Sequence, residues 1–475
     1  MTKITPVILA GGIGTRLWPI SRKNYPKQFS KIFGDRTLFQ ETLSKFSGSD
    51  EVEFNDVITL TNSEFRFIVA EQIEEINMRP GPILIEPSSK NTAPAILAAT
   101  LKVMEKDNDG ILIVTPSDQI VPDKQEFLKA LRVAKDIAED GKLVTFGVKP
   151  TRPETGFGYL ELADPISKGP QDLVRFIEKP DKPSAESMLQ SNNFLWNAGI
   201  FVFRASDMYL AFQKYCGDLI EPVTTSIFGA KKDLGFLRLA EKPWDSCINL
   251  SIDYAVMEKA KNLSVVPFNS KWSDLGGWNA VWNEYDKDKF GVALSGNATA
   301  VDCNNVLLRS EGIRQEIVGI GLQDLIAVAM PDAVLVAAKD RDQEVKNAVA
   351  ILREKQSTQA EVFTKDHRPW GWFEILTVGD NFQVKKIMVK PGASLSLQSH
   401  NFRSENWVVV SGKARVTVNE DTKYVCESQS VYIPARAKHR LENDTDEQLI
   451  IIEVQSGAYL GEDDIIRYED QFNRL

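Results

Sequence analysis

Residues 4–19 read ITPVILAGGIGTRLWP, and this stretch decides the fold. The apolar run 4–10, closed by Gly11 and Gly12, predicts a buried parallel strand that enters a turn. Similar runs recur at DVITLT (56–61), GPILIEP (81–87), GILIVTPSD (110–118) and KLVTFGV (142–148). Helical patterns lie between them, for example at 63–77 and 92–106. This alternation predicts an α/β domain with a Rossmann-like, mixed and mostly parallel sheet.

The pattern changes after residue 285. Short apolar pieces broken by Gly, Asp and Asn, followed by a helical pattern at 343–355, predict a β-rich connecting segment over 286–355. Residues 357–369 have the composition of a linker. Strand-like runs with turn residues between them then continue to the end, so residues 356–475 are expected to be an all-β domain.

Composition excludes several classes of protein. The net charge of −10 over 475 residues argues against a long basic groove for nucleic acid, although a local phosphate pocket remains compatible with it. The four cysteines lie far apart and match no zinc or disulfide spacing, which favours reduced thiols in a cytoplasm. The first apolar run is too short for a signal peptide, and no stretch of about 20 apolar residues predicts a membrane span.

The glycine-rich turn after the first strand is suited to binding an anion. Glycines let the backbone approach closely and direct its N–H groups at a phosphate. No Gly-Lys-Ser/Thr follows, so the turn is not a Walker loop. Arg16 can reach a phosphate instead, and Lys27 supplies a second cation nearby. A plain structural turn is the alternative for the glycines taken alone.

Further motifs follow in a fixed order. The loop fits GGxGTRLxPxSxxxxPK (11–27), and after it come EPSSKNTAPA (86–95), TPSD (115–118), EKP (178–180), FLWNAG (194–199) and WSDLGGW (272–278). Over residues 4–285 the chain resembles the nucleotidyltransferases that join an NTP to a sugar 1-phosphate. The whole chain resembles the two-domain mannose-1-phosphate guanylyltransferase/mannose-6-phosphate isomerase family.

The resemblance implies that GMP passes from GTP to mannose 1-phosphate, which gives GDP-mannose and pyrophosphate for polysaccharide or glycoconjugate synthesis. Such a reaction needs positioning and charge neutralisation more than a base. The resemblance assigns Mg²⁺ to Asp118 and Asp274, the β- and γ-phosphates to Arg16 and Lys27, and the sugar phosphate to Lys179. It assigns the nucleotide to Gly11, Gly12, Gly14, Thr15, Glu86 and Asn91, and the mannose hydroxyls to Gly158, Glu178 and Asn197.

The last domain resembles a cupin barrel, in which two strand segments supply the ligands of one metal. Residues 398 and 400 alternate on a strand and therefore face the same way. The matching ligand positions are Gln398, His400, Glu405 and His439. Nitrogen and oxygen ligands suit Zn²⁺, Co²⁺ or Mn²⁺. The family resemblance implies interconversion of mannose 6-phosphate and fructose 6-phosphate in this barrel.

This sequence departs from the family's histidine-rich run, because Asn401, Phe402 and Asn406 stand where histidines are usual. Arg403 is retained and could bind a substrate phosphate. Two interpretations of the barrel therefore stay open, an isomerase or a structural domain. Gln119 is a second departure, at a position where the family often has histidine.

Three functions follow as hypotheses. The first is the GDP-mannose-forming enzyme, expected to be a cytoplasmic homodimer. The second is a nucleotidyltransferase for another sugar 1-phosphate and NTP pair with a structural barrel. The third is a sugar-nucleotide sensor without catalysis, which the presence of Arg16, Lys27, Asp118, Lys179 and Asp274 disfavours.

Overall fold

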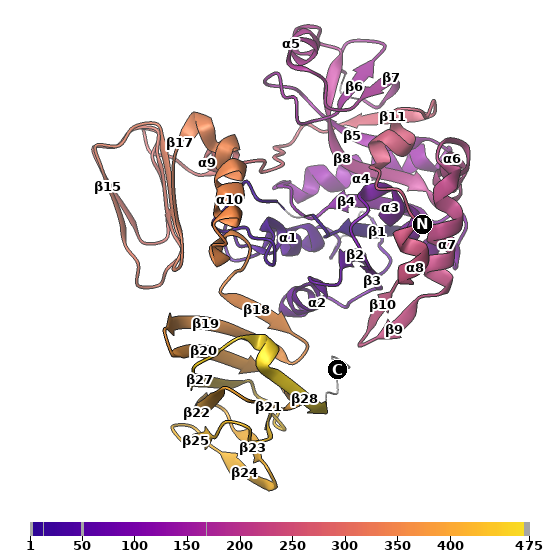
Figure 1. Ribbon diagram of the computed structural model, residues 1–475. Helices are drawn as coiled ribbons and strands as arrows, with labels where there is room; N and C mark the ends of the chain where they lie inside the picture. Colours follow the sequence, from indigo (N-terminus) through magenta and orange to yellow (C-terminus); the bar gives the residue numbers. More distant parts are fainter. Residues whose placement is uncertain (1–2, 13, 49–51, 168, 470–475) are drawn as a thin grey trace. The chain divides into compact units, whose positions relative to one another are not determined.

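The structure is a computed structural model that describes residues 3–12, 14–48, 52–167 and 169–469. Contacts divide the chain into two compact units, residues 1–361 and 362–475 (Figure 1). The division falls inside the segment 357–369. The boundaries at 285 and 355 that the sequence suggests within and after the first unit stay predictions.

The first unit is built on an eleven-stranded sheet with the order β5-β11-β7-β6-β8-β4-β1-β2-β3-β10-β9. Its centre is parallel and consists of β4 (Ile111–Pro116), β1 (Ile4–Leu9), β2 (Ile58–Asn62), β3 (Ile83–Glu86) and β10 (Phe236–Arg238). The long strand β8 (Phe194–Arg204) pairs antiparallel with β4, β5 and β6. The remaining strands are β5 (Leu143–Val148), β6 (Tyr159–Leu162), β7 (Gln171–Ile177), β9 (Lys231–Asp233) and β11 (Leu263–Pro267). The expected mixed α/β sheet is confirmed.

Helices cover both faces of this sheet, and alternate residues of β1 explain why. Ile4 and Ile8 belong to one buried cluster and Val7 to another, since successive side chains point to opposite faces. The first cluster includes residues of α1 (Leu38–Ser44), α2 (Arg66–Glu75) and α4 (Lys124–Glu139). The second includes residues of α3 (Thr92–Met104), α6 (Ala205–Tyr215), α7 (Ile220–Phe228) and α8 (Glu241–Asp245).

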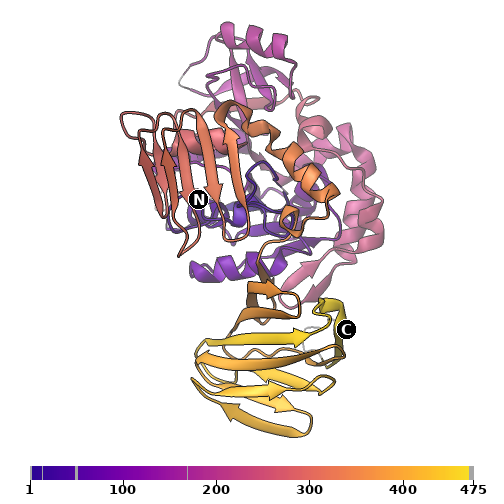
Figure 2. The ribbon, with the colours of Figure 1, turned by 60° about the vertical axis from the view of Figure 1, so that its left-hand side comes forward.

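Short strands follow α9 (Trp278–Glu284) within the same unit. One sheet has the order β12 (Ala293–Ser295), β14 (Leu307–Ser310), β16 (Leu325–Ala329) and β17 (Val334–Ala338), and β13 (Ala298–Val301) pairs with β15 (Ile317–Ile320). All of these strands pair in parallel except β17, which is antiparallel to β16. Figure 2 shows these strands stacked beside α10 (Val345–Glu354). Arg22 donates to both oxygens of Asp332 at 2.6 and 2.7 Å, which ties this stack to the loop after β1.

The second unit is a barrel of two antiparallel sheets. One has the order β18-β19-β20-β27-β22-β25 and the other β24-β23-β26-β21-β28. Their bounds are β18 Lys365–Arg368, β19 Gly371–Gly379, β20 Phe382–Val389, β21 Leu397–His400, β22 Arg403–Ser411, β23 Ala414–Val418, β24 Asp421–Val425, β25 Ser430–Ile433, β26 His439–Glu442, β27 Leu449–Gly457 and β28 Ile465–Glu469. The linker expected at 357–369 is wrong at its end, because residues 365–368 pair with β19 across a turn at Trp370.

All four cysteines are free thiols, as their spacing predicts. Within the described ranges, we find no helix of the length and apolar character that a membrane span requires.

Candidate functional site

The first site lies where the central parallel strands end. Gly11 and Gly12 follow β1, Glu86 is the last residue of β3, and Asp118 follows β4. The carboxyl ends of neighbouring parallel strands meet at one edge of the sheet, where α/β proteins bind ligands. A cavity of about 390 Å³ opens there and is called the glycine-loop cavity below. It is lined by residues that include Gly11, Gly12, Gln28, Glu86, Ser89, Asn91, Asp118 and Asn249.

Glu86 is the unusual side chain of the glycine-loop cavity. It is buried, and its Oε1 atom has no hydrogen-bond partner among the described residues. Burial raises the pKa of this carboxyl from 4.5 to about 8. A Cβ atom on Gly11 would lie 3.4 Å from Glu86 Oε2, so the glycine turn passes directly beside this carboxyl. A buried polar atom without a protein partner is costly unless a water molecule or a ligand in the cavity pairs with it.

A lysine lies beside Asp118, which lines this cavity, and beside the backbone of Asp274. Lys27 Nζ lies 3.1 Å from Asp118 Oδ2 and donates to the carbonyl oxygen of Asp274 at 2.7 Å. The sequence places these three residues far apart, and the fold brings them together. Burial raises the pKa of Asp274, an effect that the Lys27 charge opposes and the Asp118 charge reinforces. The carboxylates of Asp118 and Asp274 and the ammonium group of Lys27 are therefore close enough to influence one another electrostatically.

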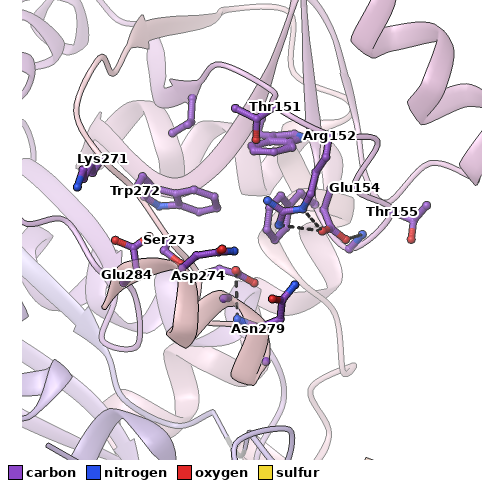
Figure 3. A pocket seen from close by; sticks show the side chains of 18 of the residues that line it. Thr151, Arg152, Glu154, Thr155, Lys271, Trp272, Ser273, Asp274, Asn279 and Glu284 are labelled. Atoms are coloured by element: carbon purple, nitrogen blue, oxygen red, sulfur yellow. Dashed lines mark hydrogen bonds and ion pairs between the residues drawn. The ribbon is translucent and has the colours of Figure 1, made fainter. Parts of the chain in front are cut away.

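Asp274 also borders a second, larger cavity of about 1150 Å³, called the tryptophan cavity because Trp196 and Trp272 line it (Figure 3). Arg16 and Lys179 line it as well. Figure 3 shows Trp272, Asp274 and Asn279 on one side and Arg152 with Glu154 on the other. The tryptophan cavity and the glycine-loop cavity thus adjoin at the group formed by Lys27, Asp118 and Asp274.

Glu178, Lys179 and Asn197 form a polar group at the end of β7 and on β8. Lys179 makes an ion pair with the buried carboxylate of Glu178, and its backbone has a left-handed φ of 45°. Burial by itself would lower the pKa of Lys179, but the hydrogen bond and charge of Glu178 outweigh it and raise the pKa. Gly158 lies close to this carboxylate, because a Cβ atom there would be 2.7 Å from Glu178 Oε2, so a larger residue would displace the Glu178 side chain.

Asp253 completes this group, and sequence reasoning missed it. Its Oδ1 accepts a hydrogen bond from Asn197 Nδ2 at 3.4 Å, and its charge contributes to the raised pKa of Lys179. Burial, and then the charge of Glu178, raises the pKa of Asp253 to about 6. Asp253 begins a π-helical turn (Asp253–Met257), a local irregularity often found at functional sites. Within its stretch SIDYAVMEK nothing distinguishes this aspartate from a helix cap.

The structure also accounts for Gln119. Its Nε2 donates to the Ala198 carbonyl at 2.9 Å, and its Oε1 accepts from Trp272 Nε1 at 3.1 Å. The side chain therefore links the two tryptophan motifs. Asn91 has a structural role of its own, because its Oδ1 accepts from the Thr92 N–H at the start of α3.

Of the predicted nucleotide residues of the glycine turn, Gly11 and Gly12 line the glycine-loop cavity, whereas Gly14 and Thr15 are not in the lining of either cavity. Gly12 accepts a hydrogen bond from Gln28 Nε2 at 2.9 Å, Gly14 accepts one from Ser21 Oγ, and Thr15 accepts one from the Trp18 N–H at 3.2 Å. These bonds use carbonyl oxygens. Arg16 is exposed at the rim of the tryptophan cavity.

The second unit contains a separate site inside its barrel. His400, Glu405 and His439 are buried, and their ligand atoms lie within 4.8 Å of one another. His400 Nε2 is 3.1 Å from Glu405 Oε1, and His439 Nε2 is 3.7 Å from Glu405 Oε2. His439 Nδ1 is 3.0 Å from the Ala437 carbonyl, the type of contact that orients a metal-binding imidazole. His439 Nε2 and His400 Nδ1 have no hydrogen-bond partner among the described residues.

Electrostatics of this triad fit a divalent cation. Burial alone would raise the pKa of Glu405, but the His400 hydrogen bond and the charges of His439 and Arg403 hold it well below its usual value. Burial lowers the pKa of His439, which favours the neutral imidazole that binds metals. Gln398 lies opposite His439 in the β21–β26 pairing, and its Oε1 accepts from Ser396 Oγ at 2.9 Å. Its role as a fourth ligand stays a prediction.

Sequence reasoning missed Glu453 and Gln455 of β27. Trp407 Nε1 donates to Glu405 Oε2 at 3.1 Å and to Glu453 Oε1 at 3.0 Å, and Gln455 Nε2 donates to Glu453 Oε2 at 2.9 Å. Burial and the neighbouring Glu405 charge raise the pKa of Glu453 well above its usual value. The alternation in LIIIEVQSG could have revealed both residues, because positions 453 and 455 share the inward face with Leu449 and Ile451.

Comparisons with known proteins agree with this architecture. Residues 5–289 match the nucleotidyl transferase family, residues 296–352 the MannoseP isomerase/GMP-like beta-helix domain and residues 355–470 the mannose-6-phosphate isomerase C-terminal domain. The chain is 42% identical to the xanthan biosynthesis protein XanB of Xanthomonas campestris pv. campestris, with 100% of both chains covered. It is 39% identical to a mannose-1-phosphate guanylyltransferase of Klebsiella pneumoniae, with 99% of this chain and 100% of the relative covered.

Two solved structures resemble parts of the chain. A protein described as mannose-1-phosphate geranyltransferase from Thermus thermophilus is 28% identical, has a TM-score of 0.64, and covers 74% of this chain and 100% of its own. The mannose-6-phosphate isomerase from Helicobacter pylori is 32% identical with a TM-score of 0.50, and covers 57% of this chain and 99% of its own. Family matches along the whole length and full-length relatives at about 40% identity agree: the chain belongs to the mannose-1-phosphate guanylyltransferase/mannose-6-phosphate isomerase family, which joins a nucleotidyltransferase domain to a cupin barrel.

Proposed function

We propose that the first unit transfers GMP from GTP to α-D-mannose 1-phosphate and forms GDP-mannose and pyrophosphate. The observation that carries this proposal is the buried carboxyl of Glu86, whose Oε1 has no partner among the described residues of the glycine-loop cavity. Guanine presents two adjacent donors, N1–H and the 2-amino group, on one edge. A carboxylate can accept both in parallel. Uracil and thymine offer a single N–H between two acceptors, and adenine offers an amino group beside an acceptor.

The other residues have roles that follow from their positions. With guanine at Glu86, the ribose and phosphates extend along the turn of Gly11, Gly12, Gly14 and Thr15 toward Lys27. Lys27 and Arg16 neutralise the phosphates that leave as pyrophosphate. Lys179 holds the phosphate of the sugar, whose oxygen attacks the α-phosphorus of GTP. Near Lys179 lie Glu178, Asn197 and Asp253. The two carboxylates can accept hydrogen bonds from mannose hydroxyls, and the Asn197 amide can donate or accept them.

Asp118 and Asp274 are the residues that would hold Mg²⁺. Their oxygen atoms are the ligand type that this ion prefers, and the charge of Lys27 beside both residues supports a site in which opposite charges are balanced. When bound, Mg²⁺ neutralises charge on the phosphates. A reaction between two anions needs cations more than it needs a general base, so we assign Lys27 a central role.

A panel of substrates tests the proposal. Purified protein with Mg²⁺ is given GTP, UTP, dTTP or ATP together with mannose 1-phosphate or glucose 1-phosphate, and pyrophosphate release is followed. The expected result is fastest release with GTP and mannose 1-phosphate. Faster release with UTP or dTTP and glucose 1-phosphate would favour the alternative nucleotidyltransferase. Binding of GDP-mannose without release from any pair would favour a sensor.

The pH dependence of product binding is a further expected result. Only the ionised Glu86 accepts both guanine donors, and its pKa in the ligand-free protein is about 8. Binding therefore requires loss of a proton below pH 8, so GDP-mannose affinity should fall as pH decreases from 8 to 6, by at most about tenfold per pH unit. Calorimetry in buffers of different ionisation enthalpy counts the released proton. GDP-mannose avoids the terminal phosphate of GTP, which itself titrates in this range. A pH-independent affinity would contradict this role of Glu86.

A second candidate function, mannose-6-phosphate isomerase activity of the barrel, is favoured by a specific observation. Asn401, Phe402 and Asn406, which replace family histidines, are all exposed, whereas His400, Glu405 and His439 are buried together. The departures thus lie outside the candidate metal site. His400, Glu405 and His439 would hold Zn²⁺, Co²⁺ or Mn²⁺, which when bound polarises a sugar carbonyl.

An isomerase assay tests this second candidate. Mannose 6-phosphate is supplied with Zn²⁺, Co²⁺ or Mn²⁺, and fructose 6-phosphate is followed. We expect turnover that His400→Ala abolishes, because that variant loses one of three buried ligands. GDP-mannose formation by the same preparation is the control for intact protein, and His367→Ala is the matched control outside the triad. Absence of turnover with an active first unit would leave the barrel as a structural domain.

A further inference from the structure

The inside of the barrel is divided into an apolar half and a polar half. Alternate residues of β20, β22 and β27 point inward, and those nearest one end of the barrel are Ile387 and Val389, Trp407 and Val409, and Leu449 and Ile451. At the other end the same inward faces carry Gln383 and Lys385, Arg403 and Glu405, and Glu453 and Gln455, all buried. Such a polar interior is costly unless its groups are paired or meet a ligand.

Most of these polar groups have partners within the strands. Arg403 donates from Nε to Glu405 Oε1 at 3.2 Å and from Nη1 to the Gly461 carbonyl at 2.9 Å. Arg403 is therefore occupied on both sides, which argues against it as the sole phosphate ligand. Lys385 forms its ion pair with Glu462, which, like Gly461, belongs to no strand of the barrel.

Glu462 stands on a short turn (Glu462–Asp464) between β27 and β28. Its side chain is 46% exposed, whereas that of Lys385 is 5% exposed. Burial by itself would raise the pKa of Glu462, but the charges of Lys385, Arg403 and Arg368 lower it. Asp464 anchors the same turn by accepting the backbone N–H groups of Asn401 and Phe402, each at 3.1 Å. The carboxylate of Glu462 thus pairs with Lys385 and lies within the field of Arg403 and Arg368, of which Arg368 also pairs with Asp366 at 2.7 Å.

Arg403 contacts both a candidate metal ligand and the segment that carries Glu462. Its Nη2 is 3.5 Å from His400 Nε2, while its Nη1 contacts the residue before Glu462. Lys385, Arg368, Glu405 and Glu462 line one common cavity. A hexose 6-phosphate carries its reacting carbons and its phosphate at opposite ends of a six-carbon chain. The lining of this cavity likewise contains both a candidate metal ligand, Glu405, and the cations Lys385 and Arg368.

We propose that Lys385 and Arg368, with Arg403 behind them, form the subsite for the phosphate monoester of a hexose 6-phosphate, and that the Glu462 carboxylate occupies this subsite when no substrate is bound. The proposal rests on the proposed isomerase function of the barrel. Substrate phosphate then displaces Glu462 from Lys385, because a dianion gains more from the three cations than a carboxylate does. Displacement of this internal anion lowers the apparent affinity for phosphate compounds.

Calorimetric titration of the full chain tests the subsite. Mannose 6-phosphate, inorganic phosphate and mannose are each titrated into the wild type and into Lys385→Met, Lys385→Arg and Glu462→Gln. The first unit is identical in all four proteins, so differences between them report on the barrel. Lys386→Met is the matched control, since it removes the neighbouring charge, which is not part of the inward face. Absorption of Co²⁺ bound to His400, Glu405 and His439 reports on folding of the barrel in each variant.

The two central variants should act in opposite directions. Glu462→Gln is expected to tighten binding of mannose 6-phosphate about threefold to fivefold, because the internal competitor is lost. Lys385→Met is expected to weaken it at least about tenfold, and Lys385→Arg to retain it. Mannose without phosphate should respond to neither change, and binding of inorganic phosphate should change in parallel with mannose 6-phosphate.

Unchanged or weaker phosphate binding in Glu462→Gln, or unchanged binding in Lys385→Met with its Co²⁺ spectrum intact, would overturn the subsite. Failure of the isomerase function is distinguishable from failure of the subsite. If the variants shift phosphate binding as expected but no fructose 6-phosphate forms, the subsite stands and the isomerase function falls. If turnover is present and neither variant alters phosphate binding, the isomerase function stands and the subsite falls.

Discussion

Asp118→Ala is expected to reduce kcat/KM for GDP-mannose formation about 10²–10³-fold while the protein stays folded. Lys27 contacts both the Asp118 carboxylate and the backbone carbonyl of Asp274, and Asp118 would supply one of the two carboxylates that hold Mg²⁺. Without this carboxylate Mg²⁺ would be held less well, and the repulsion between GTP and mannose 1-phosphate would be less well neutralised. Its side chain is 35% exposed, so the core is not disturbed. The measurement is the initial rate of pyrophosphate release from GTP and mannose 1-phosphate over a range of Mg²⁺ concentrations.

Asp136→Ala is the matched control for Asp118→Ala, because Asp136 is an exposed aspartate on α4. It should keep wild-type rates. Arg16→Ala should also lose transfer, because this exposed cation lines the tryptophan cavity and would face the leaving pyrophosphate. Near-wild-type rates for Asp118→Ala at saturating Mg²⁺ would show that Asp118 has no role in the reaction. They would also contradict the proposed position of the phosphates.

Glu86→Gln is expected to change the nucleotide preference from GTP toward UTP and dTTP. Glutamine presents one acceptor and one donor where the carboxylate presents two acceptors, so one guanine donor meets an N–H group. Leaving buried polar groups unpaired in this way should lower kcat/KM for GTP by about 10²-fold or more. The same donor and acceptor suit the N–H and carbonyl of uracil or thymine. The measurement is kcat/KM for each nucleotide with mannose 1-phosphate held constant.

Stability should change little in Glu86→Gln, because burial already favours the neutral carboxyl and glutamine is its neutral isostere. Comparison of GTP with ITP, which lacks the 2-amino group, isolates one of the two hydrogen bonds. ITP should bind less tightly than GTP to the wild type, and this difference should shrink in the variant. Glu105→Gln, at an exposed carboxylate, is the control. Unchanged GTP preference in Glu86→Gln would place guanine recognition elsewhere.

The sequence by itself determined the class of each element that repeats a regular pattern. Runs such as GILIV are buried on both faces, and their composition reveals this without tertiary contacts. The glycine turn, the EKP motif and the tryptophan motifs indicated the candidate substrate-binding residues, because each contains charged or polar residues that packing of a hydrophobic core does not need. Inside the barrel, alternation on a strand identified Gln398 and His400 as facing the same way.

Only the tertiary structure decided which of these residues meet. Lys27, Asp118 and Asp274 are joined by loops whose course depends on the packing of the whole sheet, and no local pattern encodes that distance. Residues 365–368 form a strand because β19 offers a hydrogen-bonding edge, which overrides their linker-like composition. Asp253 and Glu462 stand in ordinary local sequence. Burial beside other charges, a property of the folded chain alone, makes them part of a site.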